Sequence, residues 1–251
     1  MLASEYFSRI IERMENIKNT QMDEIDKAAA GIATRLEKGG LLYVFGSGHS
    51  HVLAEEIHER AGGLVQTRPI LPYELTMEKN VEKGAMMERA DGLGEILLTS
   101  YKVRDCDALI IISNSGRNAV PVQMAETAKN LGIFTIGITN LAHSKSVTSR
   151  LKNGKKLYEL CDVVIDNGGP LGDALVPVPN KNYSIAPAST ILGALIIELL
   201  VCSIVETMIS NGIEPLILRS ANLDGSDELN RKAREQLKER FPELQKVFTT
   251  F

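Results

Sequence analysis

Short apolar runs alternate along the chain with stretches whose apolar residues recur at helical spacing. The runs are nearly continuous, which is typical of strands that are buried on both faces of a parallel sheet. They lie at 41–46, 64–70, 107–113, 133–139 and 162–168. The helical spacing predicts helices over 4–38, 50–61, 118–131, near 155–161, 190–210 and 226–248, with a broken helical stretch over 74–102.

Turn-forming residues refine several of these elements. The first helical stretch can be two helices kinked near Asn19, and the stretch 74–102 breaks at Gly84 and at Asp91-Gly92. Pro69 cannot donate a hydrogen bond to a sheet, so the second strand is expected to be short or near an edge. We expect a Ser- and Lys-rich loop after the fourth strand and a polar loop over 167–189 after the fifth.

Five strands that alternate with helices predict an α/β fold, a doubly wound five-stranded parallel sheet with right-handed crossovers. The chain of 251 residues is near the upper size of one such domain. We therefore expect a single domain over 1–251, with its core at about 35–210. Residues 1–38 would form an N-terminal helical extension, and residues 211–251 a C-terminal helical tail.

Composition and charge narrow the function. Hydrophobic residues make up 44% of the chain and charged residues 24%, as in ordinary globular proteins. A net charge of −4 provides no positive field for a phosphodiester backbone, which argues against nucleic-acid binding. The three cysteines, Cys106, Cys161 and Cys202, are scattered, as expected for reduced thiols in a cytoplasmic protein and not for a disulfide framework or zinc site.

One segment, Thr190–Ile209, is long and apolar enough to resemble a membrane span. It contains Glu198 and Glu206, and no other part of the chain indicates a membrane. The N-terminal residues carry charges throughout and have no apolar core of a signal peptide. We therefore interpret the segment as a buried helix, which could also lie at a subunit interface.

In a parallel sheet, ligands bind beyond the carboxyl ends of the strands, so the loops that follow the strands are the candidate sites. The first, GSGHS, follows the first strand. Gly46 and Gly48 allow backbone amides to approach a ligand, and Ser50 can cap the next helix, whose N-terminus favours an anion. By itself the sequence is equally compatible with a plain tight turn, because the full glycine fingerprint of a nucleotide site is missing.

The second loop, SNSGRN, follows the most strand-like run of the chain. Ser113 and Ser115 supply hydroxyls, Gly116 permits a positive φ, and Asn118 can cap the next helix. Pro121 lies in the first turn of that helix, where its missing amide costs little. A donor-rich turn that appears twice on one sheet predicts a pocket for a phosphate group.

A third loop precedes the long apolar helix. Ser189 and Thr190 could complete an anion site there, but helix capping explains them equally well.

The order GSGHS, then IIISNSGRN, then ASTILGALIIELL resembles the SIS (sugar isomerase) domain over about residues 35–210. The resemblance implies a flavodoxin-like fold and a phosphosugar ligand, and it extends to a bacterial group named for phosphoheptose isomerase. Related SIS proteins include isomerases, N-acetylmuramic acid 6-phosphate etherases and regulators that sense sugar phosphates. By this resemblance the phosphate is bound by residues of the three loops: Ser47, Ser50, Ser113, Asn114, Ser115, Asn118, Ser189 and Thr190.

Sugar-phosphate isomerisation needs a carboxylate or histidine that moves a proton between neighbouring carbons. Glu55 and Glu59 are four residues apart and would share one helix face, although this can also be a solvated acidic face. Glu74 follows the second strand, and the resemblance places it near the base of one SIS isomerase, although a helix-start glutamate is the alternative. His49 and His51 flank the first loop and could open a sugar ring or simply bond locally.

The chain departs from phosphoheptose isomerases at two places that matter for chemistry. Their functional histidine in the helix after the third loop has no counterpart in ILGALIIEL, and Glu56 and Arg60 stand where they carry a His–Glu pair. His51 and Glu55 have a spacing that could hold a metal, but no third ligand is evident. We therefore expect no metal and no cofactor.

The sequence predicts a cytoplasmic phosphosugar-binding protein that interconverts an aldose and a ketose. Two alternatives stay open, a lyase of the etherase type and a non-catalytic sensor of sugar phosphates. The apolar faces of helices 4–38 and 190–210 exceed what one sheet face needs, so a homodimer or higher homo-oligomer is expected. We expect no nucleic-acid or membrane partner.

Overall fold

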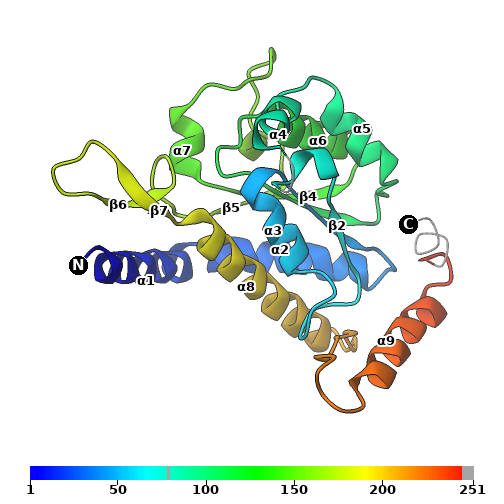
Figure 1. Cartoon of the computed structure of the whole chain (residues 1–251). Helices are drawn as coiled ribbons and strands as arrows, with labels where there is room; N and C mark the ends of the chain where they lie inside the picture. Colours follow the sequence, from blue (N-terminus) through cyan, green and yellow to red (C-terminus); the bar gives the residue numbers. More distant parts are fainter. Residues whose placement is uncertain (78–79, 245–251) are drawn as a thin grey trace.

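A computed structural model describes residues 1–77 and 80–244. Its centre is a parallel sheet of five strands in the order β2-β1-β3-β4-β5, flanked by helices (Figure 1). The strands are β1 (Leu42–Gly46), β2 (Thr67–Ile70), β3 (Ala108–Ile112), β4 (Phe134–Thr139) and β5 (Val163–Asp166). This confirms the predicted α/β fold, and β2, which contains Pro69, is an edge strand.

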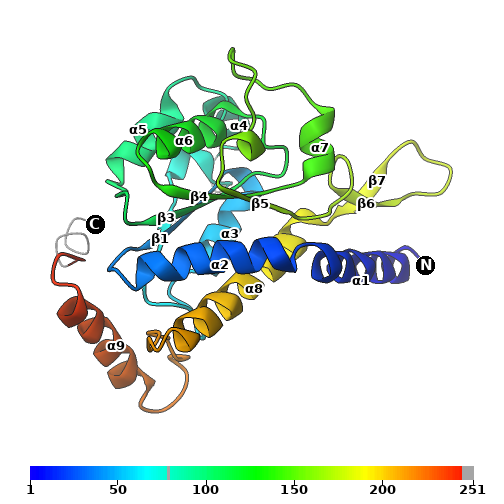
Figure 2. The same cartoon turned by 180° about the vertical axis from the view of Figure 1, so that it is seen from behind.

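Helices cover both faces of the sheet (Figures 1 and 2). One face carries α1 (Leu2–Thr20), α2 (Met22–Leu36), α3 (His51–Glu56) and α8 (Ser189–Ser210). The other carries α4 (Val81–Met87), α5 (Leu93–Ser100), α6 (Ala119–Asn130) and α7 (Leu141–Ser146). The sheet is therefore sandwiched between two helical layers, as expected for a doubly wound fold.

The alternation of side chains along β1 explains this sandwich. Leu42 and Val44 belong to the hydrophobic cluster under α2 and α8, whereas Tyr43 and Phe45 belong to the cluster under α5 and α6. All four are buried, because successive side chains of a strand point to opposite faces. A strand covered on both sides therefore needs the nearly continuous apolar sequence seen here.

The apolar helix α8 has the length and composition of a membrane span. Its side chains Ile196, Leu200 and Ile204 are nonetheless fully buried in the cluster that α2 also joins. Its Glu198 reaches Arg60, with 3.5 Å between the carboxylate and guanidinium atoms. The helix thus serves as a core helix of the sandwich.

The break expected near Asn19 is confirmed, because the first helical stretch divides at Gln21 into α1 and α2. Other predicted boundaries are wrong. The helix expected over 50–61 ends at Glu56. Gly84 lies inside α4 and does not interrupt it, whereas the break at Asp91-Gly92 is confirmed by the left-handed Gly92.

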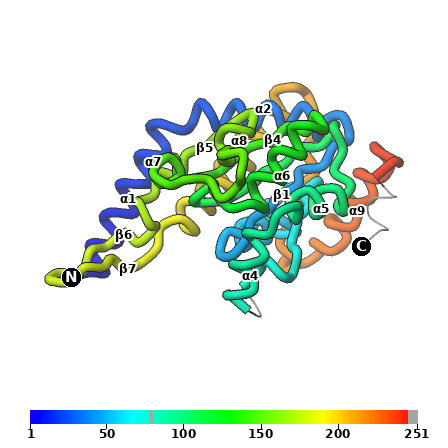
Figure 3. The backbone as a smooth tube through the Cα atoms, turned by 90° about the horizontal axis from the view of Figure 1, so that it is seen from above, coloured from blue at the N-terminus to red at the C-terminus, as the bar shows by residue number. Residues whose placement is uncertain are grey.

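The connecting segments also contain more structure than expected. The helix expected near 155–161 is a single 3-10 turn, Leu157–Glu159, and the predicted Ser- and Lys-rich loop contains α7. The loop expected over 167–189 contains a hairpin of β6 (Ala174–Pro177) and β7 (Ser184–Pro187). This hairpin lies beside α1 at one end of the molecule (Figure 3), and Tyr6 Oη donates to Pro187 O at 3.1 Å.

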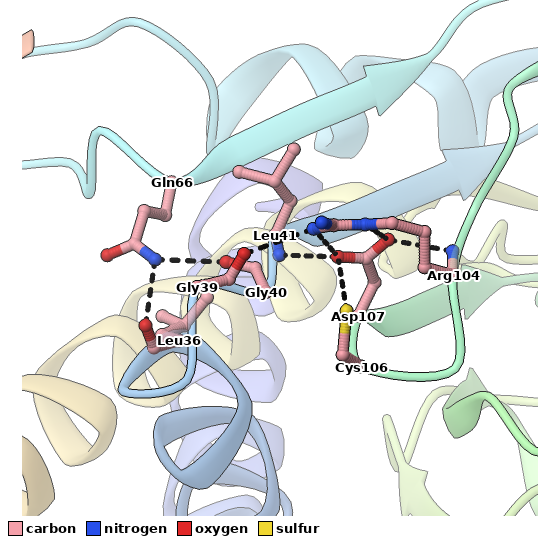
Figure 4. A network of polar contacts seen from close by, with 8 residues as sticks. All are labelled: Leu36, Gly39, Gly40, Leu41, Gln66, Arg104, Cys106 and Asp107. Atoms are coloured by element: carbon pink, nitrogen blue, oxygen red, sulfur yellow. Dashed lines mark hydrogen bonds and ion pairs between the residues drawn. The ribbon is translucent and has the colours of Figure 1, made fainter. Parts of the chain in front are cut away.

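Asp107 holds the amino ends of β1 and β3 together (Figure 4). Its fully buried carboxylate accepts hydrogen bonds from Leu41 N and Arg104 N, both at 2.8 Å, and from the Arg104 guanidinium. Gln66 Nε2 binds the carbonyls of Leu36 and Gly40 nearby. Buried polar groups need such partners, and here they fix the turn that leads from α2 into β1.

The C-terminal segment packs beside β2. Residues 216–218 pair antiparallel with 63–65, and α9 (Ser226–Arg240) follows them. Leu237 of α9 is buried in the same cluster as Tyr43 and Phe45. The helices α1 and α9 lie at opposite ends of the molecule (Figure 3).

Candidate functional site

The strand order reverses between β1 and β3. From β1 the chain proceeds to β2 on one side, and the later strands β3, β4 and β5 lie on the other side. Such a reversal opens a crevice at the carboxyl ends of the two central strands. Ser47 follows β1 and Ser113 follows β3, so both lie at this crevice.

A pocket of about 280 Å³ lies at this point, and we call it the serine pocket. It combines hydroxyl, amide, imidazole and carboxylate groups from three loops, from α7 and from the end of α4. Its lining residues are Ser47, Ser50, Glu88, Ser113, Asn114, Ser115, His143, Gly172 and Asp173. The volume and polarity suit a small, polar, charged ligand.

The loop after β1 approaches the following helical turn closely. A Cβ on Gly46 would lie 2.3 Å from Ser50 O, so only glycine fits there. Ser47 Oγ donates to Glu88 Oε1 at 2.7 Å, which ties this loop to the end of α4. Ser50 occupies the N-cap position of α3, but its side chain makes no capping hydrogen bond, which corrects the expectation from the sequence.

The loop after β3 turns at a glycine in the left-handed conformation. Gly116 has φ +56°, and its amide donates to Ser113 Oγ at 3.2 Å. Asn114 Oδ1 accepts from Asn167 Nδ2 at 2.9 Å. Asn118 occupies the N-cap position of α6, but its side-chain oxygen accepts from Arg150 Nη1 and does not cap the helix as expected. Of the first backbone groups of α6, Val120 N donates to the Glu88 carbonyl at 3.1 Å, and Pro121 has no N–H.

Asp173 is a carboxylate held in place by the start of α8. Its Oδ1 accepts from Ser189 N at 2.8 Å and from Ala188 N at 3.2 Å, and its Oδ2 accepts from Ser189 Oγ at 2.7 Å. Its φ of +74° is unusual for a residue with a Cβ. Backbone conformations of this kind concentrate at functional sites.

His143, near the start of α7, faces the same pocket. Its Nδ1 accepts a hydrogen bond from Gly172 N at 3.2 Å. A neutral ring whose Nδ1 accepts must carry its proton on Nε2. The ring can therefore donate a hydrogen bond or a proton from Nε2.

Comparison with known proteins identifies the family. The family model described as SIS domain matches residues 5–140, more than half of the chain. The chain belongs to the SIS domain family.

Relatives of known sequence and structure agree with this membership. The UPF0309 protein GK1441 of Geobacillus kaustophilus is 40% identical over 243 residues, which cover 97% of each chain. A phosphoheptose isomerase from Francisella tularensis has the same fold, with a TM-score of 0.54 at 19% identity, covering 80% of this chain and 95% of that one. The sugar isomerase domain of an RpiR transcription factor from Sphaerobacter thermophilus gives a TM-score of 0.50 at 15% identity, covering 95% and 98%.

Most of the SIS residues predicted to bind phosphate lie at the serine pocket. Ser189 and Thr190 line a narrower crevice beside it, and Ser50 and Asn114 border both. Asn118 lies just behind the pocket at the start of α6. The predicted residues that line the pocket itself are Ser47, Ser50, Ser113, Asn114 and Ser115.

None of the five predicted catalytic residues lines the serine pocket. His49 and Glu74 are exposed, and His51 is buried with its Nδ1 against Gly48 O. Glu55 lies 3.5 Å from His51 Nε2. Glu59 follows the end of α3 with φ +49° and pairs with Arg234 of α9, so the expectation that it shares a helix face with Glu55 is wrong.

Three titratable residues line the pocket but were not predicted from the sequence, namely Glu88, His143 and Asp173. The reasons differ. Glu88 follows α4 within a stretch that reads simply as helix, and Asp173 lies in what reads as a polar loop. His143 follows β4 by four residues, so the rule that sites lie at strand ends could have found it. In the part of the chain that the structure describes, no three His, Cys, Asp or Glu side chains gather as metal ligands would.

Proposed function

We propose that this SIS protein binds a phosphorylated sugar in the serine pocket and interconverts its aldose and ketose forms, with Glu88 as the base. The observation that carries the proposal is the pocket itself, which combines the serine loops of the family with two carboxylates and a histidine. The family membership supports a phosphosugar ligand. We place the protein in the cytoplasm, where such ligands and reduced cysteines occur.

The phosphate group would be bound at the start of α6. The hydroxyls of Ser113 and Ser115 lie there, together with the positive end of the helix dipole. Hydroxyls and amides bind an anion without a cation in contact. The sugar carbons would then extend toward Glu88, His143 and Asp173 on the other walls of the pocket.

Glu88 suits the role of base better than Asp173. Each oxygen of Asp173 is already engaged by the start of α8, through three hydrogen bonds. Among residues 1–77 and 80–244, Glu88 accepts one side-chain hydrogen bond, from Ser47 to Oε1, which leaves Oε2 to face a substrate. A base must have a free lone pair within reach of the proton that it removes.

The proposed reaction moves one proton between two carbons. Glu88 takes the proton from C2 of the open-chain aldose while Nε2–H of His143 protonates the carbonyl oxygen at C1, which gives an enediol. Glu88 then returns its proton to C1, and the hydroxyl at C2 gives its proton back to His143 as the ketose carbonyl forms. Both side chains end in their starting states, and no external co-reactant is consumed.

The decisive experiment replaces Glu88 by Gln. With a series of hexose, heptose and amino-sugar phosphates as substrates, Glu88→Gln should lower kcat at least 100-fold, as expected when a general base is lost. The Kd for the sugar phosphate, measured by calorimetry, should change little. Glu82→Gln, an exposed glutamate of α4, is the matched control and should keep full activity.

Other outcomes would overturn the proposal in recognisable ways. An unchanged kcat in Glu88→Gln would remove Glu88 from the mechanism. Binding by the wild type without turnover of any sugar phosphate would favour a sensor, and an unsaturated product would favour a lyase. If no sugar phosphate bound at all, the serine pocket would not be a phosphosugar site.

A further inference from the structure

A second pocket of about 330 Å³ lies on the far side of the start of α6. It borders the serine pocket, because Arg89, which lines it, directly follows Glu88 of the serine pocket. We call it the arginine pocket after its basic residues. Its lining residues are Arg89, Asp91, Ala119, Gln123, Glu126, Arg150, Leu151, Lys152 and Asn153.

The cations of this pocket have no carboxylate partner among residues 1–77 and 80–244. Arg89 and Lys152 form no ion pair in this part of the chain, and Arg150 Nη1 donates to the neutral side-chain oxygen of Asn118. By contrast, the acidic groups are engaged. Glu126 lies 3.6 Å from Lys155 Nζ, and Asp91 Oδ1 accepts from Gln123.

The arginines also repel one another. Burial lowers the pKa of Arg150, and the neighbouring charges of Arg89 and Arg117 lower it further, with Glu88 partly offsetting them. Arg117 extends the cluster behind the pocket, where its guanidinium donates to Thr148 Oγ1 at 3.4 Å. Carboxylates offset these like charges only in part, and a bound anion would relieve the remaining repulsion.

Two arginines on the surface of α1 and α9 show the ordinary arrangement. Arg231 of α9 pairs with Glu228 and Glu235, and Arg9 pairs with Glu5. Surface arginines usually meet such carboxylates one turn away on the same helix. The arginine pocket instead draws its cations from two separated segments, residue 89 and residues 150–152, onto one side of α6.

We propose that the arginine pocket is a second anion site, which takes a phosphate or carboxylate group beside the phosphosugar. Among the residues that the structure describes, no lysine or arginine lines the serine pocket, so the two sites recognise anions by different chemistry. Arginine binds such planar or tetrahedral oxyanions through two parallel hydrogen bonds. The group can belong to the same sugar, as in a bisphosphate, or to a separate small anion.

The test uses calorimetry at low ionic strength, where exposed charges are least screened. Inorganic phosphate is titrated into the wild type and into the double variant Arg89→Gln, Lys152→Gln. Two phosphates should bind per wild-type chain. The double variant should lose the arginine-pocket site and keep the serine-pocket site. The Ser113→Ala, Ser115→Ala variant should do the reverse. The affinity of the lost site should fall about 10-fold or more, as expected for charge-assisted hydrogen bonds.

The matched control is Arg231→Gln, Lys232→Gln, which removes the same charge from the exposed face of α9. It should bind phosphate as the wild type does. The proposal fails if Arg89→Gln, Lys152→Gln binds phosphate with the stoichiometry and affinity of the wild type. It also fails if the wild type binds a single phosphate and the Ser113→Ala, Ser115→Ala variant binds none. Loss of turnover in Glu88→Gln bears only on the proposed isomerase and leaves this result unaffected.

Two further ligands identify the source of the anion. If the second group is on the sugar, fructose 1,6-bisphosphate should bind the wild type about 10-fold more tightly than fructose 6-phosphate, and the double variant should lose that difference. If the anion is separate, inorganic phosphate should still bind to protein that is saturated with fructose 6-phosphate.

Discussion

At the scale of single residues, Gly116 determines the shape of the loop after β3. Its φ is +56°, and a Cβ there would lie 2.9 Å from Ser144 Oγ and 3.1 Å from Thr139 Oγ1. Ser144 is fully buried, so the close-packed interior leaves its hydroxyl little room to move away from an added Cβ. The loop can therefore keep its serines at the pocket only with glycine at this position.

Gly116→Ala should both destabilise the protein and weaken phosphosugar binding. A left-handed alanine costs about 1–2 kcal/mol, and the two close contacts add to that cost. Gly132→Ala is the matched control, because Gly132 has φ +73° but no atom within 4 Å of its Cβ position. Urea unfolding should show a larger loss for Gly116→Ala, and calorimetry should show weaker sugar-phosphate binding only there. Equal behaviour of the two variants would contradict the role of the loop.

At the scale of elements, Leu237 is the most buried of the apolar side chains that attach α9 to the sandwich. Leu237 is buried in the cluster of Tyr43 and Phe45, whereas the ion pair between Arg234 and Glu59 is exposed. Burial of a leucine contributes several times more than a surface ion pair. The packing of α9 should therefore depend on Leu237.

Leu237→Ala should lower the free energy of unfolding by about 2–4 kcal/mol, because it leaves a cavity in the core. Arg234→Ala should cost less than about 1 kcal/mol. Leu229→Ala, on the same helix but 41% exposed, is the control and should have little effect. Chemical denaturation followed by circular dichroism measures all three, and a loss for Leu229→Ala equal to that for Leu237→Ala would show that burial is not the cause.

The strands whose positions could be predicted well from the sequence are those whose residues are all buried. β1 and β3 are entirely buried, so their apolar runs had to be nearly unbroken, and their positions were predicted within one or two residues. The errors fall where tertiary contacts override local pattern. The helix after β1 stops at Glu56 although helical spacing continues, and the β6–β7 hairpin pairs residues whose sequence reads as a polar loop.

At the scale of the whole molecule, the two halves of the serine pocket differ in how they arise. Ser47 and Ser113 follow directly from strand ends, so local sequence and the topology rule suffice to bring them together. Glu88 and Asp173 reach the pocket only through packing, Glu88 by its bond to Ser47 and Asp173 by its bonds to Ser189. Neither contact has a periodic signature, which is why their place at the site had to come from the structure.

The N-terminal helix provides the last prediction, because α1 projects past the edge of the sheet beside the β6–β7 hairpin (Figures 1 and 3). Its inner side buries Ile10 and Ile17, but Phe7 and Ile11, one turn apart on another side, are 65% and 38% exposed. A projecting helix is stable mainly through tertiary packing, and exposed apolar side chains of this kind mark contact surfaces.

We therefore expect the wild type to be a homodimer that contacts its partner through this side of α1. Light scattering should give about twice the mass of one chain, and Phe7→Asp, Ile11→Asp should reduce it to that of a monomer. Ile96→Asp, on α5 in the opposite helical layer and 62% exposed, introduces the same kind of charge and should leave the dimer intact. A monomeric wild type would refute the dimer, and a dimeric double variant would place its interface away from α1.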